Sequence, residues 1–219
     1  MGYAHDWVSV TGLDKDEVLS RLGLVDRGEP LDYPRRGDFA WAITAQGRVL
    51  IVTDYDELPL DRIAELSRGA SLVAARAEGN DCTSSVWGYE DGRQIWSVAT
   101  EAPGETDRLY DEEVEGSLIV AGDPPSEFAA IRDRHLAERN LEDDDAEDFL
   151  FMAPLELAET LGGWEPEGKI GQDLQFFRVI SAGRSDQSKG LGDKPKVNKL
   201  WVGLAILLFV IAAYRMWLA

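Results

Sequence analysis

Metal-centred or nucleophilic chemistry would have to draw on very few side chains, because the chain holds only His5, His135 and Cys82 as nitrogen or sulfur ligands. A zinc site needs Cys, His or carboxylate ligands clustered at suitable spacing, and these three residues are far apart in sequence. Cys82 and His135 would form a dyad only if the fold brought them together. His135 lies on the apolar side of a predicted helix, where a hydrogen-bonded core histidine is the commoner arrangement. We therefore expect no catalytic residue, metal ion or cofactor.

Carboxylates are the other candidate ligands, and they gather in the stretch LEDDDAEDF, which holds Asp143, Asp144 and Asp145. Calcium prefers oxygen ligands, but this stretch lacks the alternation and the central glycine of an EF-hand loop. We interpret it as a solvated acidic loop and its three aspartates as candidate contacts for a protein partner. The sequence has no G-x-S-x-G elbow, Walker A loop or G-x-G-x-x-G motif, so no motif indicates an enzyme class.

The charge of the chain is extreme and unevenly distributed. Residues 1–183 hold 16 basic and 39 acidic residues, a net charge of -23, whereas residues 184–219 hold 6 basic and 2 acidic residues, a net charge of +4. An acidic body of this kind repels phosphate, which argues against nucleic-acid binding. Two interpretations stay open: a solvated surface that favours solubility, and a docking face for a basic protein.

The clearest local pattern is SSVWGYEDGRQIWSV, which predicts a hairpin with a type I′ turn at Asp91-Gly92. In the simplest register Glu90 faces Arg93 and Trp87 faces Trp96. Tyr89 and Val98 then share the face of the two tryptophans. These aromatic residues suit either the core or a partner-binding platform, so Trp87, Tyr89 and Trp96 are candidate partner contacts.

The remaining segments predict an α+β fold: a mainly antiparallel sheet with a few short helices. In DWVSVTGLDKDEVLSRLGL a strand precedes a helix with Asp14 as N-cap, Glu17 three residues later and Gly23 at its end. Two strands joined by Gln46-Gly47 are predicted in DFAWAITAQGRVLIVTDY. Further strands are predicted in ASLVAARAE, GSLIVAG and LQFFRVI, and further helices in LDRIAELSRGA, in PPSEFAAIRDRHLAERN and around 155–161.

In the helix of PPSEFAAIRDRHLAERN, Phe128, Ile131, His135 and Leu136 are expected on one face. Together, the DGR-x-x-W-S-V hairpin, IRDRHLAE and PLELAETL resemble small bacterial proteins of uncharacterised function, over about residues 7–163. This resemblance implies no activity.

The last residues of the chain pose a different question. Residues 200–214 are 15 residues without a charge, and residues 200–219 would reach about 30 Å as a helix, the thickness of a hydrocarbon core. Trp201 at one end and Tyr214 and Trp217 at the other suit the two membrane interfaces, where Arg215 can also extend its charge. We expect one transmembrane helix over 200–219; a buried core helix and an in-plane interfacial helix are the alternatives.

Orientation follows from the lysines before this helix. Lys194, Lys196 and Lys199 precede the span, and positive residues stay on the cytoplasmic side. The chain therefore divides into an acidic cytosolic domain over 1–180, a flexible basic linker over 181–199 and a tail anchor over 200–219, with the C-terminus translocated. A single cysteine and the absence of a signal pattern at the N-terminus agree with a cytoplasmic body.

Three functions fit these features. The first is a single-pass, tail-anchored membrane protein that presents an acidic domain to a protein partner, with the bilayer contacting residues 200–219. The second is an immunity-type protein that neutralises a basic toxin, because an acidic face gives fast electrostatic capture. The third is an enzyme with an unrecognised site.

Overall fold

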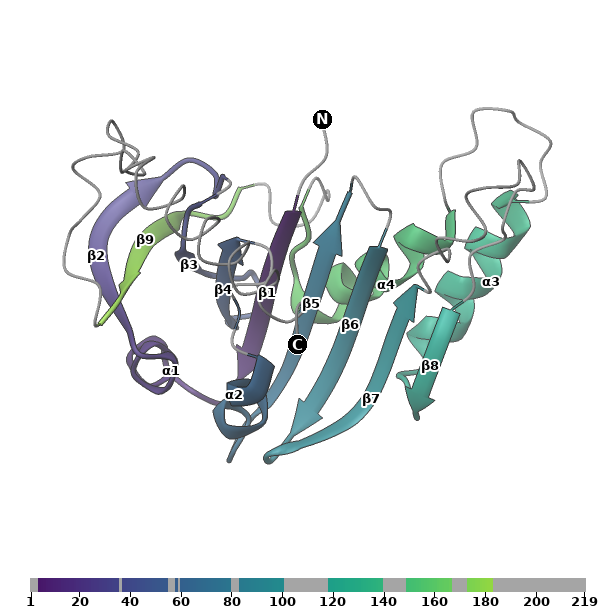
Figure 1. The fold of residues 1–219 in the computed structure, drawn as a ribbon, viewed down its shortest axis with the longest axis horizontal. Coiled ribbons are helices and arrows are strands. Elements are labelled where there is room, and N and C mark those ends of the chain that lie inside the picture. Colours follow the sequence, from purple (N-terminus) through teal and green to yellow (C-terminus); the bar gives the residue numbers. More distant parts are fainter. Residues whose placement is uncertain are drawn as a thin grey trace, which may run out of the picture. The chain divides into compact units, whose positions relative to one another are not determined.

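One antiparallel sheet dominates the computed structural model, which describes residues 4–35, 37–54, 58, 60–79, 83–100, 118–139, 149–166 and 173–182. Within these ranges nine strands lie in the order β2-β9-β3-β4-β1-β5-β6-β7-β8 (Figure 1). The strands are β1 (Ala4–Thr11), β2 (Leu24–Leu31), β3 (Ala40–Ile43), β4 (Val49–Asp54), β5 (Ser71–Glu78), β6 (Thr83–Glu90), β7 (Arg93–Thr100), β8 (Leu118–Gly122) and β9 (Phe176–Ser181). The helices are α1 (Lys15–Leu22), α2 (Leu60–Leu66), α3 (Glu127–Arg139) and α4 (Phe149–Gly162). The predicted α+β class with a mainly antiparallel sheet is confirmed.

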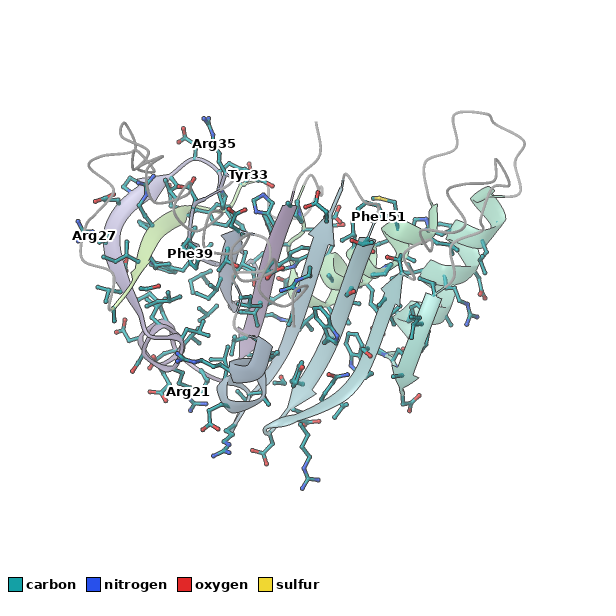
Figure 2. The ribbon with its side chains drawn as sticks, viewed as in Figure 1. Arg21, Arg27, Tyr33, Arg35, Phe39 and Phe151 are labelled. Atoms are coloured by element: carbon teal, nitrogen blue, oxygen red, sulfur yellow. The ribbon has the colours of Figure 1, made fainter. Side chains whose placement is uncertain are left out.

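The sheet buries apolar side chains on both of its faces. On the face covered by α3 and α4, here called the α4 face, Trp7, Val86 and Trp96 join Leu155 and Phe176 in one core. On the opposite α1 face a second core contains Val8 and Val10 with residues of α1 and α2. Phe151 on α4 belongs to the first core, and Phe39 packs against the second (Figure 2). The two cores follow from the alternation of side chains along each strand.

Helix α1 begins and ends where its capping residues indicate. The carboxylate of Asp14 accepts a hydrogen bond of 2.8 Å from the backbone N–H of Glu17, as an N-cap does. Gly23 follows the last turn with a φ of 67°, a left-handed conformation that glycine adopts without steric cost. Arg21 then joins α1 to the end of α2, since its Nη1 donates to the carbonyl oxygens of Leu66 at 3.0 Å and Arg68 at 2.7 Å (Figure 2).

Two predictions about elements need correction. Strand β2 was not expected, because LVDRGEPL has no apolar alternation and contains Gly28 and Pro30. It lies at the edge of the sheet and pairs with β9, with a register shift between Asp26 and Pro30. Helix α4 begins at Phe149 rather than near 155, and it contains Pro154. Burial of the side chains of Leu150 and Phe151 offsets the hydrogen bond that a proline removes.

Helix α3 follows the expected pattern except at its last position. Phe128, Ile131 and His135 are buried, and α3 packs on α4. Leu136, which was expected on the same face, is 37% exposed because it lies one residue past the buried stripe.

A buried ion pair holds the middle of the sheet together. Asp6 on β1 is fully buried, and its cross-strand neighbour is Arg76 on β5. Arg76 donates from Nε to Oδ1 of Asp6 at 2.7 Å and from Nη2 to Oδ2 at 2.8 Å. The backbone N–H of Leu58 also donates to Oδ2 at 3.2 Å, so the same carboxylate fixes the chain that follows β4. Such two-point pairing compensates the carboxylate for its lost hydration.

We expect Asp6→Ala to lower the free energy of unfolding by about 3–5 kcal/mol, because Arg76 would keep its charge without the buried carboxylate. Asp6→Asn retains the shape and one acceptor, so it should cost less. The matched control is Asp16→Ala, whose side chain is 85% exposed and which should change stability by no more than about 0.5 kcal/mol. Urea unfolding followed by tryptophan fluorescence measures all three. A loss for Asp6→Ala no larger than that of the control would contradict this account of the pair.

Candidate interaction surface

The hairpin of β6 and β7 turns as the sequence indicates. Asp91 and Gly92 have φ values of 45° and 84°, the positive values that a type I′ turn requires, and Glu90 is paired with Arg93. The turn is attached to the end of α2. The N–H of Asp91 donates to the carbonyl oxygen of Ala70 at 3.0 Å, and the N–H of Gly92 donates to Oγ of Ser67 at 2.9 Å. The hairpin is therefore fixed at its tip.

The predicted pairing of Trp87 with Trp96 is wrong. A register shift lies between Gly88 and Tyr89, so Trp87 lies opposite Ser97 and Trp96 lies opposite Gly88. The extra residue is Ile95, and it moves every later residue of β7 to the other face of the sheet. Trp96 is consequently buried in the core of the α4 face, whereas Trp87 packs against the core of the α1 face.

Gly88 was the signal that could have located this bulge. A β-carbon at Gly88 would collide with the indole of Trp96, so only glycine leaves room for that ring above the strand. A glycine inside a strand often marks a bulge or a close approach. Val98 shares the α4 face with Trp96, and Tyr89 shares the α1 face with Trp87, so the expected four-residue cluster is divided between the two faces.

The side chains of Trp87 and Tyr89 are half-buried at a part of the α1 face that has little cover. On this face α2 contacts β6 near the turn, and no described helix lies over β7 and β8 (Figure 1). The hydroxyl of Tyr89 donates to Oε1 of Gln94 at 3.1 Å, and burial raises the pKa of its phenol. Register places six side chains together here, and we call them the open face: Ser85, Trp87, Ser97, Ala99, Ile119 and Ala121.

Several predicted site residues lie outside the described residues. They are Cys82, the acidic residues Asp143, Asp144 and Asp145, and the membrane-interface residues Lys194, Lys196, Lys199, Trp201, Tyr214, Arg215 and Trp217. Their predicted roles stay predictions. Of the aromatic candidates, the structure brings Trp87 and Tyr89 together and separates Trp96 from them.

His135 joins α3 to α4 as a hydrogen-bonded core histidine, as expected. It is buried, and its Nε2 lies 2.9 Å from Oε2 of Glu156, which also pairs with Arg134. Burial raises the pKa of Glu156, but the hydrogen bonds and charges of Arg134 and His135 outweigh it and hold the pKa below its usual value. A persistent carboxylate between two donors is suited to joining two helices. In the described part of the chain, no three His, Cys, Asp or Glu side chains cluster so that they would hold a metal ion.

His5 is buried on β1, against the indole of Trp164. The ring centroids are 6.5 Å apart with the planes at 71°, and Nδ1 lies 3.3 Å from the carbonyl oxygen of Thr53. Burial lowers the pKa of His5 and outweighs the contacts that favour its charge, the carbonyl of Thr53 and the carboxylates of Asp54 and Asp6. The folded protein therefore holds this imidazole neutral at pH 7, which is a packing role.

Comparison with known proteins adds no assignment: no protein-family model, curated protein or solved structure matches the chain.

The four helices that the structure describes are too short or too polar to cross a bilayer. The predicted span at 200–219 lies outside the described ranges.

We expect His5 to make the protein less stable as the pH falls through and below 6.5, the ordinary pKa of histidine. In that range the unfolded chain takes up a proton that the folded chain excludes, so unfolding becomes more favourable until the lowered pKa of the folded state is reached. His5→Gln removes this proton uptake and should flatten the dependence of the unfolding free energy on pH in the same window. Urea unfolding at a series of pH values tests it, and equal slopes for both proteins would contradict it.

We also expect Gly88→Ala to destabilise the protein by about 1–3 kcal/mol, because the added methyl displaces the indole of Trp96. The cost should shrink when Trp96→Ala is already present, since the collision is then gone. Ser85→Ala, on the same strand but on the open face, serves as the control and should change stability little. If the losses in unfolding free energy for Gly88→Ala and Trp96→Ala were additive, the two residues would not be in contact, which would contradict this explanation.

Proposed function

We propose that this chain is a tail-anchored, single-pass membrane protein whose acidic domain faces the cytosol and binds a protein partner. The observation that carries the proposal is the division of the sequence into an acidic body with net charge -23 and an uncharged stretch over 200–214 bounded by aromatic residues. A charged body followed by one apolar stretch is the arrangement expected of a soluble domain anchored in a bilayer.

Two features of the domain support protein binding over catalysis. The open face exposes apolar groups beside half-buried Trp87, and aromatic residues of this kind are enriched at protein interfaces. The two histidines are both buried in packing positions, where they hydrogen-bond to Thr53 and Glu156. An excess of carboxylates also raises the rate at which a basic protein is captured.

The membrane part of the proposal predicts that the full chain resists extraction from membranes by alkaline carbonate. Phe209→Arg places a charge at the centre of the predicted span, which costs about 2.5–3.5 kcal/mol on insertion, and should move most of the protein to the soluble fraction. Phe209→Leu keeps the span apolar and is the matched control. Protease added from the cytosolic side should digest the domain. Equal extraction of both variants, or a protected domain, would contradict the anchor or its orientation.

The binding part predicts that the full chain, captured from a mild-detergent lysate, retains one stoichiometric partner. Raising the salt concentration from about 0.1 M to about 1 M shortens the Debye length from about 10 Å to about 3 Å and should release that partner. A chain ending at Ala182 should capture the same protein if recognition lies in the domain. A basic, toxic partner would support the immunity-type function instead, and a partner captured only by the full chain would place recognition in the linker or the span.

A further inference from the structure

The two edges of the sheet differ in how they are protected. Unprotected edge strands pair with other chains, and proteins block them with charges, prolines and bulges. Strand β2 at one edge has all three, with Arg27, Glu29, Pro30 and a register shift. Strand β8 at the other edge has the sequence LIVAG, which contains no charge and no proline, and its pairing with β7 is regular throughout.

Strand β8 is also exposed on both of its faces. Ile119, on the α1 face, is 55% exposed, and Val120, on the α4 face, is 45% exposed. Ile119 has the largest exposed fraction of the large hydrophobic side chains that the structure describes, and the fraction of Val120 equals those of Val25 and Ile43. Figure 1 shows β8 as the outermost strand, with α3 beside it and no further strand of the described chain on its outer side. Within the described chain, its outer edge is paired with no other strand.

The open face continues into this edge, so a strand added to β8 would also contact the open face. Ile119 lies opposite Ala99, and Ala121 lies opposite Ser97, whose other neighbour is Trp87. A strand added to β8 would place alternate side chains beside Ile119 on the open face, because side chains along a strand alternate between its faces. This face offers apolar contacts, so the added strand should carry apolar residues at every second position.

The charge of the chain decides which occupant fits. The connection from β7 to β8 begins after Thr100 and ends before Leu118, which are paired at this edge. Its sequence over 101–117 has seven acidic residues, Glu101, Glu105, Asp107, Asp111, Glu112, Glu113 and Glu115, and one basic residue, Arg108. A second copy of the chain would bring up a second body of net charge -23, and repulsion between the two bodies disfavours that pairing. A basic segment would be attracted.

We infer that β8 is a docking edge for an extended segment of a basic protein partner, which adds to the sheet as one further strand with apolar and basic residues in alternation. The inference rests on the proposed protein-binding function and specifies its site. Backbone hydrogen bonds to β8 supply affinity, Ile119 and the open face select the apolar positions, and the net negative charge of residues 1–183 favours basic residues at the others.

The test uses the full chain in detergent micelles and a labelled peptide of alternating lysine and valine, with binding to empty micelles subtracted. Ile119→Lys together with Val120→Lys protects the edge with charge and should weaken binding at least about tenfold. Val25→Lys is the matched control, since Val25 is 45% exposed on the opposite edge strand β2 and its variant should bind as the wild type does. A peptide with N-methylated backbone amides should also bind at least about tenfold more weakly, because it cannot complete the ladder.

Each outcome bears on the edge separately from the proposed function. Binding that is insensitive to the β8 substitutions or to backbone methylation would overturn the docking edge, as would absence of peptide binding. A chain that sediments as a dimer and becomes monomeric on Ile119→Lys with Val120→Lys would assign the edge to a second copy instead. A partner captured equally by wild type and this double variant would overturn the edge and leave the proposed function standing. Peptide binding that depends on β8, with no protein captured, would support the edge and count against the proposed function.

Discussion

The structure depends on the burial of both faces of its central strand. Residues 5–10 of β1 are all buried, and successive side chains enter different cores: Trp7 packs on the α4 face, and Val8 and Val10 pack on the α1 face. A strand of this kind needs helices above and below it, and Asp6 is tolerated there only because Arg76 occupies both of its oxygens. Moving outward from β1, this requirement relaxes, until only Leu118 of β8 packs against a core and Ile119 and Val120 are exposed. Burial thus decreases toward both edges of the sheet, since Val25 on β2 is 45% exposed as well.

Three arginines of the domain hold its parts together. Arg76 pairs with the buried Asp6, Arg21 ties α1 to the end of α2, and Arg134 shares Glu156 between α3 and α4. Arg76 and Arg134 each neutralise a carboxylate within the fold. The chain as a whole keeps a net charge of -19. This arrangement allows attraction of a basic partner at a distance while internal pairs secure the framework.

Local patterns predicted most of the elements, because caps and turns act over a few residues. Asp14, Gly23 and the Asp91-Gly92 turn each determine backbone geometry on their own, and the structure confirms them. What the sequence could not reveal depends on distant partners. Strand β2 exists because β9, more than a hundred residues later, pairs with it, and β9 itself lies between β2 and β3 with Phe177 stacked on Trp41 at 4.8 Å. The site was predicted in part: Trp87 and Tyr89 are together, and Trp96 is apart because one unpaired residue follows the turn.

That single unpaired residue has a consequence for how this fold can change over generations. Side chains alternate between the two faces along β7. The number of residues between the turn and a given position therefore decides on which face that position lies. Loss of one codon in the hairpin would exchange the inner and outer sets of the whole strand at once, turning Trp96 outward while leaving every remaining amino acid unaltered. In this part of the molecule, a change in chain length can remodel the surface more than a substitution can.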